Sequence, residues 1–236
     1  MKNKRIEAID IFRGWAIVLM IGYHFGYDLN LFGYIHTHPN SNELWILVRY
    51  TIITMFLLSM GMSLKLVHLE EIKWKKVIKR SIILGVASIL VTISTYIEFP
   101  RSWVYFGILH FIFVSSLVGL LFLSYPRFSL FVAISIFITY ALGWLKFHSL
   151  YILLKETLSL PRYTQDFVPF LPWFAVVLIG IVIVSYEWHK RLPPNSFLGA
   201  DTALNRVLGF MGRYSLIIYL IHIPIIFGIF LLIRLL

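Results

Sequence analysis

The sequence predicts an all-α fold, a membrane-embedded bundle of about seven transmembrane helices that forms a single domain over residues 1–236. Hydrophobic residues make up 59% of the chain and the mean hydropathy is +0.84, well above the range of a soluble domain. Apolar runs of about 20 residues, the length that crosses a bilayer, alternate with short loops. We therefore expect a multi-pass protein of the cell (cytoplasmic) membrane, in contact with membrane lipids.

The distribution of Lys and Arg predicts the orientation of the chain. The formal net charge is +10, but the basic residues cluster in particular loops between the apolar runs. If the N-terminus is cytoplasmic, the inner segments hold the larger share of them, which is the usual bias of membrane proteins. We therefore expect the N-terminus inside and the C-terminus outside, and no nucleic-acid partner. The chain has no cysteine, which excludes thiolate metal sites and Cys nucleophiles.

Taken in order, the apolar segments and the stretches between them define the elements. Two connecting stretches carry apolar residues at helical spacing and are predicted as short helices on the membrane surface, 150–160 outside and 201–212 inside, the second capped by Asp201 or Thr202. The predicted spans are 9–32, 44–66, 77–97, 103–124, 128–146, 168–186 and 213–235.

The first span carries four ionisable residues on one face. Arg13 follows Asp10 by three positions, His24 follows Arg13 by eleven, and Asp28 follows His24 by four. At about 100° per residue these spacings return to nearly the same azimuth. Ionisable side chains inside a membrane are costly and normally face the interior of a bundle. We expect a polar seam in which His24 is a general base and Asp28 orients its imidazole; hydrogen bonding across the bundle is the structural alternative.

The other histidines offer further candidates. His110 lies in the fourth span at about the depth of His24, which makes it a second catalytic candidate or a satisfied core residue. His222, in the seventh span, lies on a face that suits either helix packing or the acceptor side of a site. His36 and His38 in the first outer loop form a His-x-His pair without an evident third ligand, so no metal is predicted.

Charged and aromatic residues near the outer ends of the spans form the predicted acceptor side of the site. On the inner side, Asp10 and Arg13 are grouped with Arg213 as donor-binding or supporting residues, because guanidinium groups pair well with phosphate. The basic run 73–80 is a topology determinant that also suits contact with an anionic donor or an anionic lipid. The acceptor-side group is Arg49, Arg101, Asp166, Trp173 and His222.

Several blocks that carry these residues point to a known family. They cover most of the chain in the right order, and together they resemble the bacterial heparan-alpha-glucosaminide N-acetyltransferase-like family. The spacing of Arg13 and His24 is also similar to the signature of the membrane acyltransferase-3 proteins, in which that His is regarded as catalytic and Arg and Asp support it. The blocks are Arg5-Ile-Glu-Ala-Ile-Asp-Ile-Phe-Arg-Gly14, Met20, His24-Phe-Gly-Tyr-Asp-Leu29, Phe106-Gly-Ile-Leu-His110, Asp166-Phe-Val-Pro-Phe-Leu-Pro-Trp173 and Gly212-Arg-Tyr-Ser-Leu-Ile-Ile-Tyr-Leu-Ile-His222.

The resemblance implies an acyltransferase that moves an acyl group, acetyl in the family, from cytoplasmic acyl-CoA to a sugar or other acceptor outside. Acetyl-CoA would then be the co-substrate and a glycan or glycolipid the acceptor. Larger members of the family carry their catalytic His in an outer loop, which leaves His24 and the loop residues His36 and His38 as alternatives. The oligomeric state stays open, a homodimer included.

Two other classes of function fit the same residues. A transporter or flippase would use the polar seam as a proton relay. A haem-binding membrane protein would use His24, His110 or His222 as axial ligands of the iron.

Overall fold

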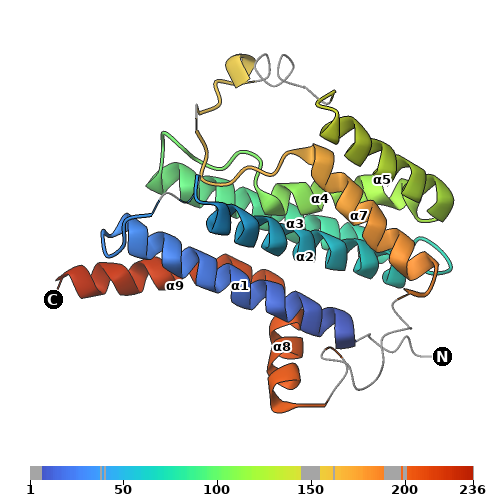
Figure 1. The fold of residues 1–236 in the computed structure, drawn as a ribbon, viewed down its shortest axis with the longest axis horizontal. Coiled ribbons are helices and arrows are strands. Elements are labelled where there is room, and N and C mark those ends of the chain that lie inside the picture. The colour runs from blue at the N-terminus through green and yellow to red at the C-terminus, as the bar shows by residue number, and fades with distance from the viewer. Residues whose placement is uncertain are drawn as a thin grey trace. The chain divides into compact units, whose positions relative to one another are not determined.

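The structure is a computed structural model that describes residues 7–37, 39, 41–144, 155–161, 163–188, 198 and 201–235. The described part is all helical apart from its loops, as predicted; it contains no strand, only an isolated bridge between Phe106 and Phe167. The elements are α1 (Glu7–Leu31), α2 (Glu43–Val67), α3 (Trp74–Glu98), α4 (Ile108–Gly119), the 3₁₀ turn η1 (Leu120–Phe122), α5 (Pro126–Ala141), α7 (Phe170–Ser185), α8 (Ala203–Arg213) and α9 (Ser215–Leu235) (Figure 1).

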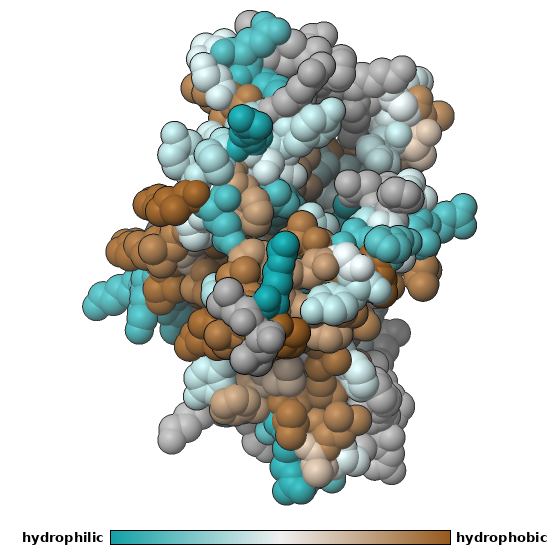
Figure 2. Space-filling view, turned by 90° about the vertical axis from the view of Figure 1, so that its left-hand side faces the viewer, coloured by the Kyte–Doolittle hydropathy of each residue, from teal (hydrophilic) through white to brown (hydrophobic). Residues whose placement is uncertain are grey.

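Each predicted span contains a helix, but the helices differ in length. By length and composition, four of those in the described part can cross a membrane: α1, α2, α3 and α9. Large hydrophobic side chains are exposed along them, and Figure 2 shows such side chains gathered on the face it presents. This is the surface of a multi-pass membrane protein. The other apolar helices are shorter, Ile108–Phe122, Pro126–Ala141 and Phe170–Ser185.

The predicted helix over 201–212 is present as α8. The Thr202 hydroxyl accepts the Asn205 N–H at 3.1 Å, which caps the helix as predicted. In the other predicted surface helix, 150–160, residues 150–154 lie outside the described residues, and only 155–157 are seen as a helical turn.

The helices group into two compact units, and the division falls inside α2 after Ser59. The first unit comprises Met1–Ser59 and His189–Leu236, and the second comprises Met60–Trp188. The core of the first unit forms around Ile17 and Met20 of α1 and Ile52 of α2. Side chains of α8 and α9 pack against the same cluster, so segments from both ends of the chain build this unit.

Glycines let α1 and α8 touch through their backbones. A Cβ atom on Gly14 would collide with the Leu208 carbonyl, and one on Gly212 would collide with the Asp10 carbonyl. Only glycine fits at either position, so the two helices meet along a contact that no larger residue permits. Figure 1 shows α8 beside the N-terminal half of α1.

The second unit is organised around α7, whose residues from Phe174 to Val184 are almost all buried. The helix packs against α5 and α4, while α3 packs against α4. Gly61 of α2 lies so close to the Val177 carbonyl that a side chain would collide with it. This apolar packing holds the helix ends that line the cavity described below.

Candidate functional site

Arg13 ties three helices of the first unit together. Its Nε donates to the Ser59 hydroxyl at 3.3 Å, Nη2 donates to the Ser59 carbonyl at 3.4 Å, and Nη1 donates to the Gly212 carbonyl at 3.4 Å. The Asp10 carboxylate lies 3.6 Å from Nη1 and is 4% exposed. The spacing of Asp10 and Arg13 does bring them together, and the guanidinium is largely occupied by the protein's own groups.

His24 has a defined tautomer. Its Nδ1 lies 2.9 Å from the Met20 carbonyl, one turn earlier in α1. Because a carbonyl oxygen only accepts, Nδ1 must carry the proton in this bond, and Nε2 of the neutral ring then carries a lone pair. The helix itself therefore fixes the tautomer of the neutral imidazole, with the proton on Nδ1 and the lone pair on Nε2.

Asp28 does not take part in that bond. The sequence predicted that its carboxylate would orient His24, but the Met20 carbonyl receives the Nδ1 proton instead. The side chain of Asp28 is buried at 6% exposure one turn further along α1. A backbone acceptor at i−4 is available to any helical histidine, so side-chain spacing alone did not reveal this partner.

His222 of α9 lies against His24. The two ring centroids are 4.8 Å apart and the planes are nearly perpendicular, at 81°. The Nδ1 of His222 donates to the Tyr219 carbonyl at 2.7 Å, so its Nε2 also carries a lone pair. This Nε2 is buried and has no hydrogen-bond partner among the residues that the structure describes. A buried polar atom without a partner is rare in proteins, so this nitrogen is a candidate for a functional role.

The two rings therefore form a pair in which both Nδ1 atoms are tied to backbone and both Nε2 atoms carry lone pairs. We refer to His24 and His222 as the histidine pair. Two imidazoles on opposite sides of one haem iron would have centroids about 6 Å apart, given metal–nitrogen distances of about 2 Å. At 4.8 Å the histidine pair is too close for that arrangement.

His110 belongs to the second unit, and both of its ring nitrogens are used. The Thr92 hydroxyl donates to the Val104 carbonyl at 2.8 Å, so His110 Nε2 must donate to Thr92 Oγ1 at 3.0 Å. Its Nδ1 then accepts the Gly107 N–H at 3.3 Å. These bonds hold the start of α4 and leave neither nitrogen with a spare lone pair or proton.

Asp166 completes the same helix start. Its Oδ2 accepts the Ile108 N–H at 2.7 Å, and Gly107 packs directly against this carboxylate. A carboxylate at a helix N-terminus is favourable because the free N–H groups and the helix dipole both attract it. Trp173, the other predicted acceptor-side residue of this region, lies half-buried at the start of α7.

The remaining candidates are spread over the two units. In the first unit, Arg49 lies on α2 with its guanidinium 5.6 Å from the Tyr50 ring, and Arg213 is exposed at the end of α8. His36 is exposed in the first loop, and its predicted partner His38 lies outside the described residues. Arg101 is exposed in a loop of the second unit. Among the described residues, no group of three or more His, Cys, Asp or Glu side chains has metal-binding geometry.

Besides the Met20 carbonyl, two further contacts of the site were not anticipated from the sequence. Ser59 had a visible signal, since a serine within an apolar span usually has a hydrogen-bond partner. The contact between His24 and His222 had none, because the two residues lie far apart in the chain and only tertiary packing joins them.

A sequence model of the heparan-alpha-glucosaminide N-acetyltransferase catalytic domain matches residues 5–224. Searches of curated proteins and of solved structures found no match. The matched range includes Arg13, the histidine pair, His110 and Asp166 and leaves out only short terminal segments. The chain therefore belongs to the heparan-alpha-glucosaminide N-acetyltransferase family, which makes it, at the level of the family, an acetyltransferase.

Proposed function

We propose that this protein transfers an acetyl group from acetyl-CoA to the amine of a glucosamine residue in a glycan or glycolipid, with His24 as the general base. The family supplies the reaction class and the type of acceptor. The single observation that carries the residue assignment is the hydrogen bond from His24 Nδ1 to the Met20 carbonyl, which leaves Nε2 as a base. An imidazole ordinarily titrates near the working pH of a cell, which suits general base catalysis.

The proposed step conserves atoms and charge. The neutral amine attacks the thioester carbonyl of acetyl-CoA, and His24 Nε2 takes the proton that the nitrogen loses. The carbon–nitrogen bond forms as the carbon–sulfur bond breaks. The leaving thiolate of CoA then receives the proton from His24, which restores the neutral ring.

A second route uses the same atom as a nucleophile. His24 Nε2 would accept the acetyl group and then pass it to the amine, in two steps. Quenching the enzyme after mixing with labelled acetyl-CoA, without acceptor, separates the routes: label on the protein that is absent in His24→Ala favours the acetyl-histidine, and no label favours direct transfer.

The proposal includes a direction across the membrane. Acyl-CoA is a cytoplasmic metabolite, and the basic loops that the orientation places inside attract its phosphates. The acceptor then approaches from outside.

The decisive experiment incubates membranes that contain the full-length protein with labelled acetyl-CoA and a glucosamine-terminated acceptor. We expect labelled N-acetylated product from the wild type and at least a hundredfold less from His24→Ala, since general base catalysis contributes about 10²–10⁴-fold. His24→Gln keeps a donor for the Met20 carbonyl but lacks the base, so it should be equally inactive.

The rival base is tested in the same assay. His36 is exposed in the first loop, so His36→Ala removes a histidine without disturbing the core. We expect it to retain activity. Loss of transfer in His36→Ala together with turnover by His24→Ala would overturn the assignment of the base and move it to the loop.

A further inference from the structure

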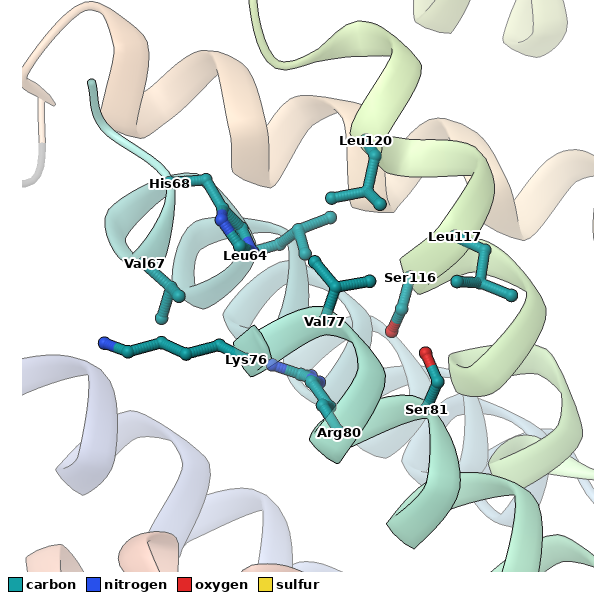
Figure 3. Close-up of a pocket in the computed structure, with 10 residues that line it drawn as sticks. All are labelled: Leu64, Val67, His68, Lys76, Val77, Arg80, Ser81, Ser116, Leu117 and Leu120. Atoms are coloured by element: carbon teal, nitrogen blue, oxygen red, sulfur yellow. The ribbon is translucent and has the colours of Figure 1, made fainter. Parts of the chain in front are cut away.

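A cavity in the second unit lies between the ends of three helices, two of them C-terminal and one N-terminal. It has a volume of about 170 Å³ and opens between the C-terminal end of α2, the first turns of α3 and the C-terminal end of α4 with η1 (Figure 3). Its apolar wall comes from Leu64, Val67, Val77, Leu117 and Leu120, and its polar wall comes from His68, Lys76, Arg80, Ser81 and Ser116.

The polar wall is cationic. Lys76 and Arg80 lie four residues apart on α3, which puts both on one face of the helix. None of the described residues that line the cavity is acidic. The guanidinium of half-buried Arg80 has no carboxylate and no hydrogen-bond acceptor among the described residues. A partly buried cation without a counter-charge is unfavourable, so an anion in the cavity would stabilise it.

The hydroxyl groups favour an oxyanion with several acceptor oxygens. Figure 3 shows the side chains of Ser81 and Ser116 pointing toward one another from α3 and α4. Ser116 donates its proton to the Ile112 carbonyl at 2.6 Å. Ser81 has no such bond within the described part of the chain, so its O–H is available as a donor in the wall that also holds Arg80. Arg, Lys and a hydroxyl around a small space are the groups that bind phosphate.

We propose that this cavity binds the phosphate group of an amphiphilic molecule, with Arg80 and Ser81 as donors, exposed Lys76 adding positive charge at its rim, and the leucine and valine wall against its apolar part. Two sources share this chemistry: the phosphates of CoA and the headgroup of an anionic lipid. The first source rests on the proposed function, and the second does not. Neither depends on His24, which belongs to the other unit.

The test measures binding to the full-length protein in nanodiscs of zwitterionic phosphatidylcholine. CoA without an acyl group is the first probe, and pantetheine, which lacks the phosphates, is its control. If CoA is the ligand, Arg80→Gln should weaken its binding about tenfold or more, because a charge-assisted hydrogen bond is lost. Pantetheine should bind weakly to both proteins.

Lys79→Gln is the matched control, since Lys79 precedes Arg80 on the same helix, is exposed and does not line the cavity. It removes the same charge and should change CoA affinity less than about twofold. Ser81→Ala is a mild change that should weaken CoA binding less than Arg80→Gln but more than Lys79→Gln. It keeps the test valid if Arg80→Gln does not fold.

The second arm asks whether the ligand is a lipid. Native mass spectrometry of protein purified from mixed phosphatidylglycerol and phosphatidylcholine membranes counts retained phosphatidylglycerol. Loss of that lipid in Arg80→Gln but not in Lys79→Gln, with unchanged CoA binding, assigns the cavity to a lipid headgroup.

The proposal is overturned if Arg80→Gln and Ser81→Ala match Lys79→Gln with both probes. His24→Ala separates this outcome from a failure of the proposed function: it should abolish transfer while leaving CoA affinity and lipid retention unchanged.

Discussion

At the scale of single residues, backbone carbonyls determine the chemistry of the histidine pair. Met20 and Tyr219 each accept the Nδ1 proton of a histidine in their own helix, so both Nε2 atoms keep their lone pairs. The orientation of His24 thus needs no charged partner. If His24 takes a proton during transfer it becomes a cation, and we expect the neutral ring of His222, whose centroid lies 4.8 Å away, to stabilise that charge with its lone pair.

His222 is therefore a positioning residue, and its replacement should affect the chemical step. We expect His222→Leu, which removes the nitrogen lone pair at similar volume, to lower kcat about tenfold with an unchanged KM for acetyl-CoA. His222→Gln should recover part of the activity, because its carboxamide oxygen is again an acceptor. A His222→Leu enzyme with full kcat would contradict this role; unfolding midpoints in detergent check that both variants are folded.

His68 makes the stability of the protein depend on pH. Burial lowers the pKa of His68 below its ordinary value of 6.5, and the positive charges of Arg80, Lys73 and Lys76 lower it further, against a backbone hydrogen bond to Glu71. Below about pH 6.5 the unfolded chain binds a proton at this position that the folded chain does not yet bind. Stability is therefore complete above that pH and falls as the pH drops toward the folded pKa.

The measurement compares unfolding midpoints of the wild type and His68→Gln at pH 7.5 and pH 5.5 in one detergent. Gln retains an oxygen for the Lys73 N–H that His68 Nδ1 accepts at 3.0 Å. We expect the wild type to lose more stability on acidification than the variant. Equal losses would show that His68 does not titrate differently on folding.

Spacing within one helix was enough to predict the neighbours Asp10 and Arg13, because residues three apart on a helix always share a face. Spacing alone did not predict hydrogen bonds to backbone groups or to side chains of another helix. His110 reads as a second base in the sequence, whereas the structure gives both of its nitrogens to Thr92 and Gly107. The relation of Arg13 and His24 to the acyltransferase-3 signature stays a prediction.

At the scale of helices, the contact between α1 and α8 depends on two glycines. Gly14 faces the Leu208 carbonyl and Gly212 faces the Asp10 carbonyl, so the backbones meet without intervening side chains. This close approach brings the Gly212 carbonyl within reach of Arg13. One of the acceptors of Arg13 is thus supplied by a helix from the other end of the sequence.

A methyl group at either glycine should separate the helices. We expect Gly14→Ala and Gly212→Ala each to lower the free energy of unfolding by about 1–3 kcal/mol or more, the usual cost of overpacking. Gly22→Ala is the control, because Gly22 lies in α1 like Gly14 but has open space around it. It should leave the free energy of unfolding unchanged or raise it by about 0.5–1 kcal/mol. Thermal unfolding in detergent measures all three, and a stable Gly212→Ala protein would argue against the close contact.

At the scale of the whole molecule, hydropathy located the helices but not the residues at which they begin. The segment 103–124 reads as one continuous span, but its helix begins only at Ile108, because 102–107 pairs with 164–168 through bonds such as Gln165 N–H to the Ser102 carbonyl. Periodicity cannot detect such an irregular pairing. Loop charge predicts the orientation, which the arrangement of the helices does not test.

The absence of cysteine makes the orientation straightforward to measure. Single cysteines at exposed Lys75 and Arg101, at opposite ends of α3, are labelled with a membrane-impermeant maleimide on intact cells. We expect Arg101→Cys to react directly and Lys75→Cys to react only after permeabilisation, because the basic end should be cytoplasmic. The reverse pattern would invert the orientation, and equal labelling would mean that α3 does not cross.

The glycine contact between α1 and α8 also affects the order of assembly during biosynthesis. Translation delivers α1 to the membrane before α8 leaves the ribosome, so Arg13 enters the bilayer paired with Asp10 but without the Gly212 carbonyl. A nascent chain that stalls before residue 203 exposes these charges to lipid or to insertion chaperones. An incomplete chain therefore differs from the finished protein at its first helix, and completion of α8 supplies the missing acceptor.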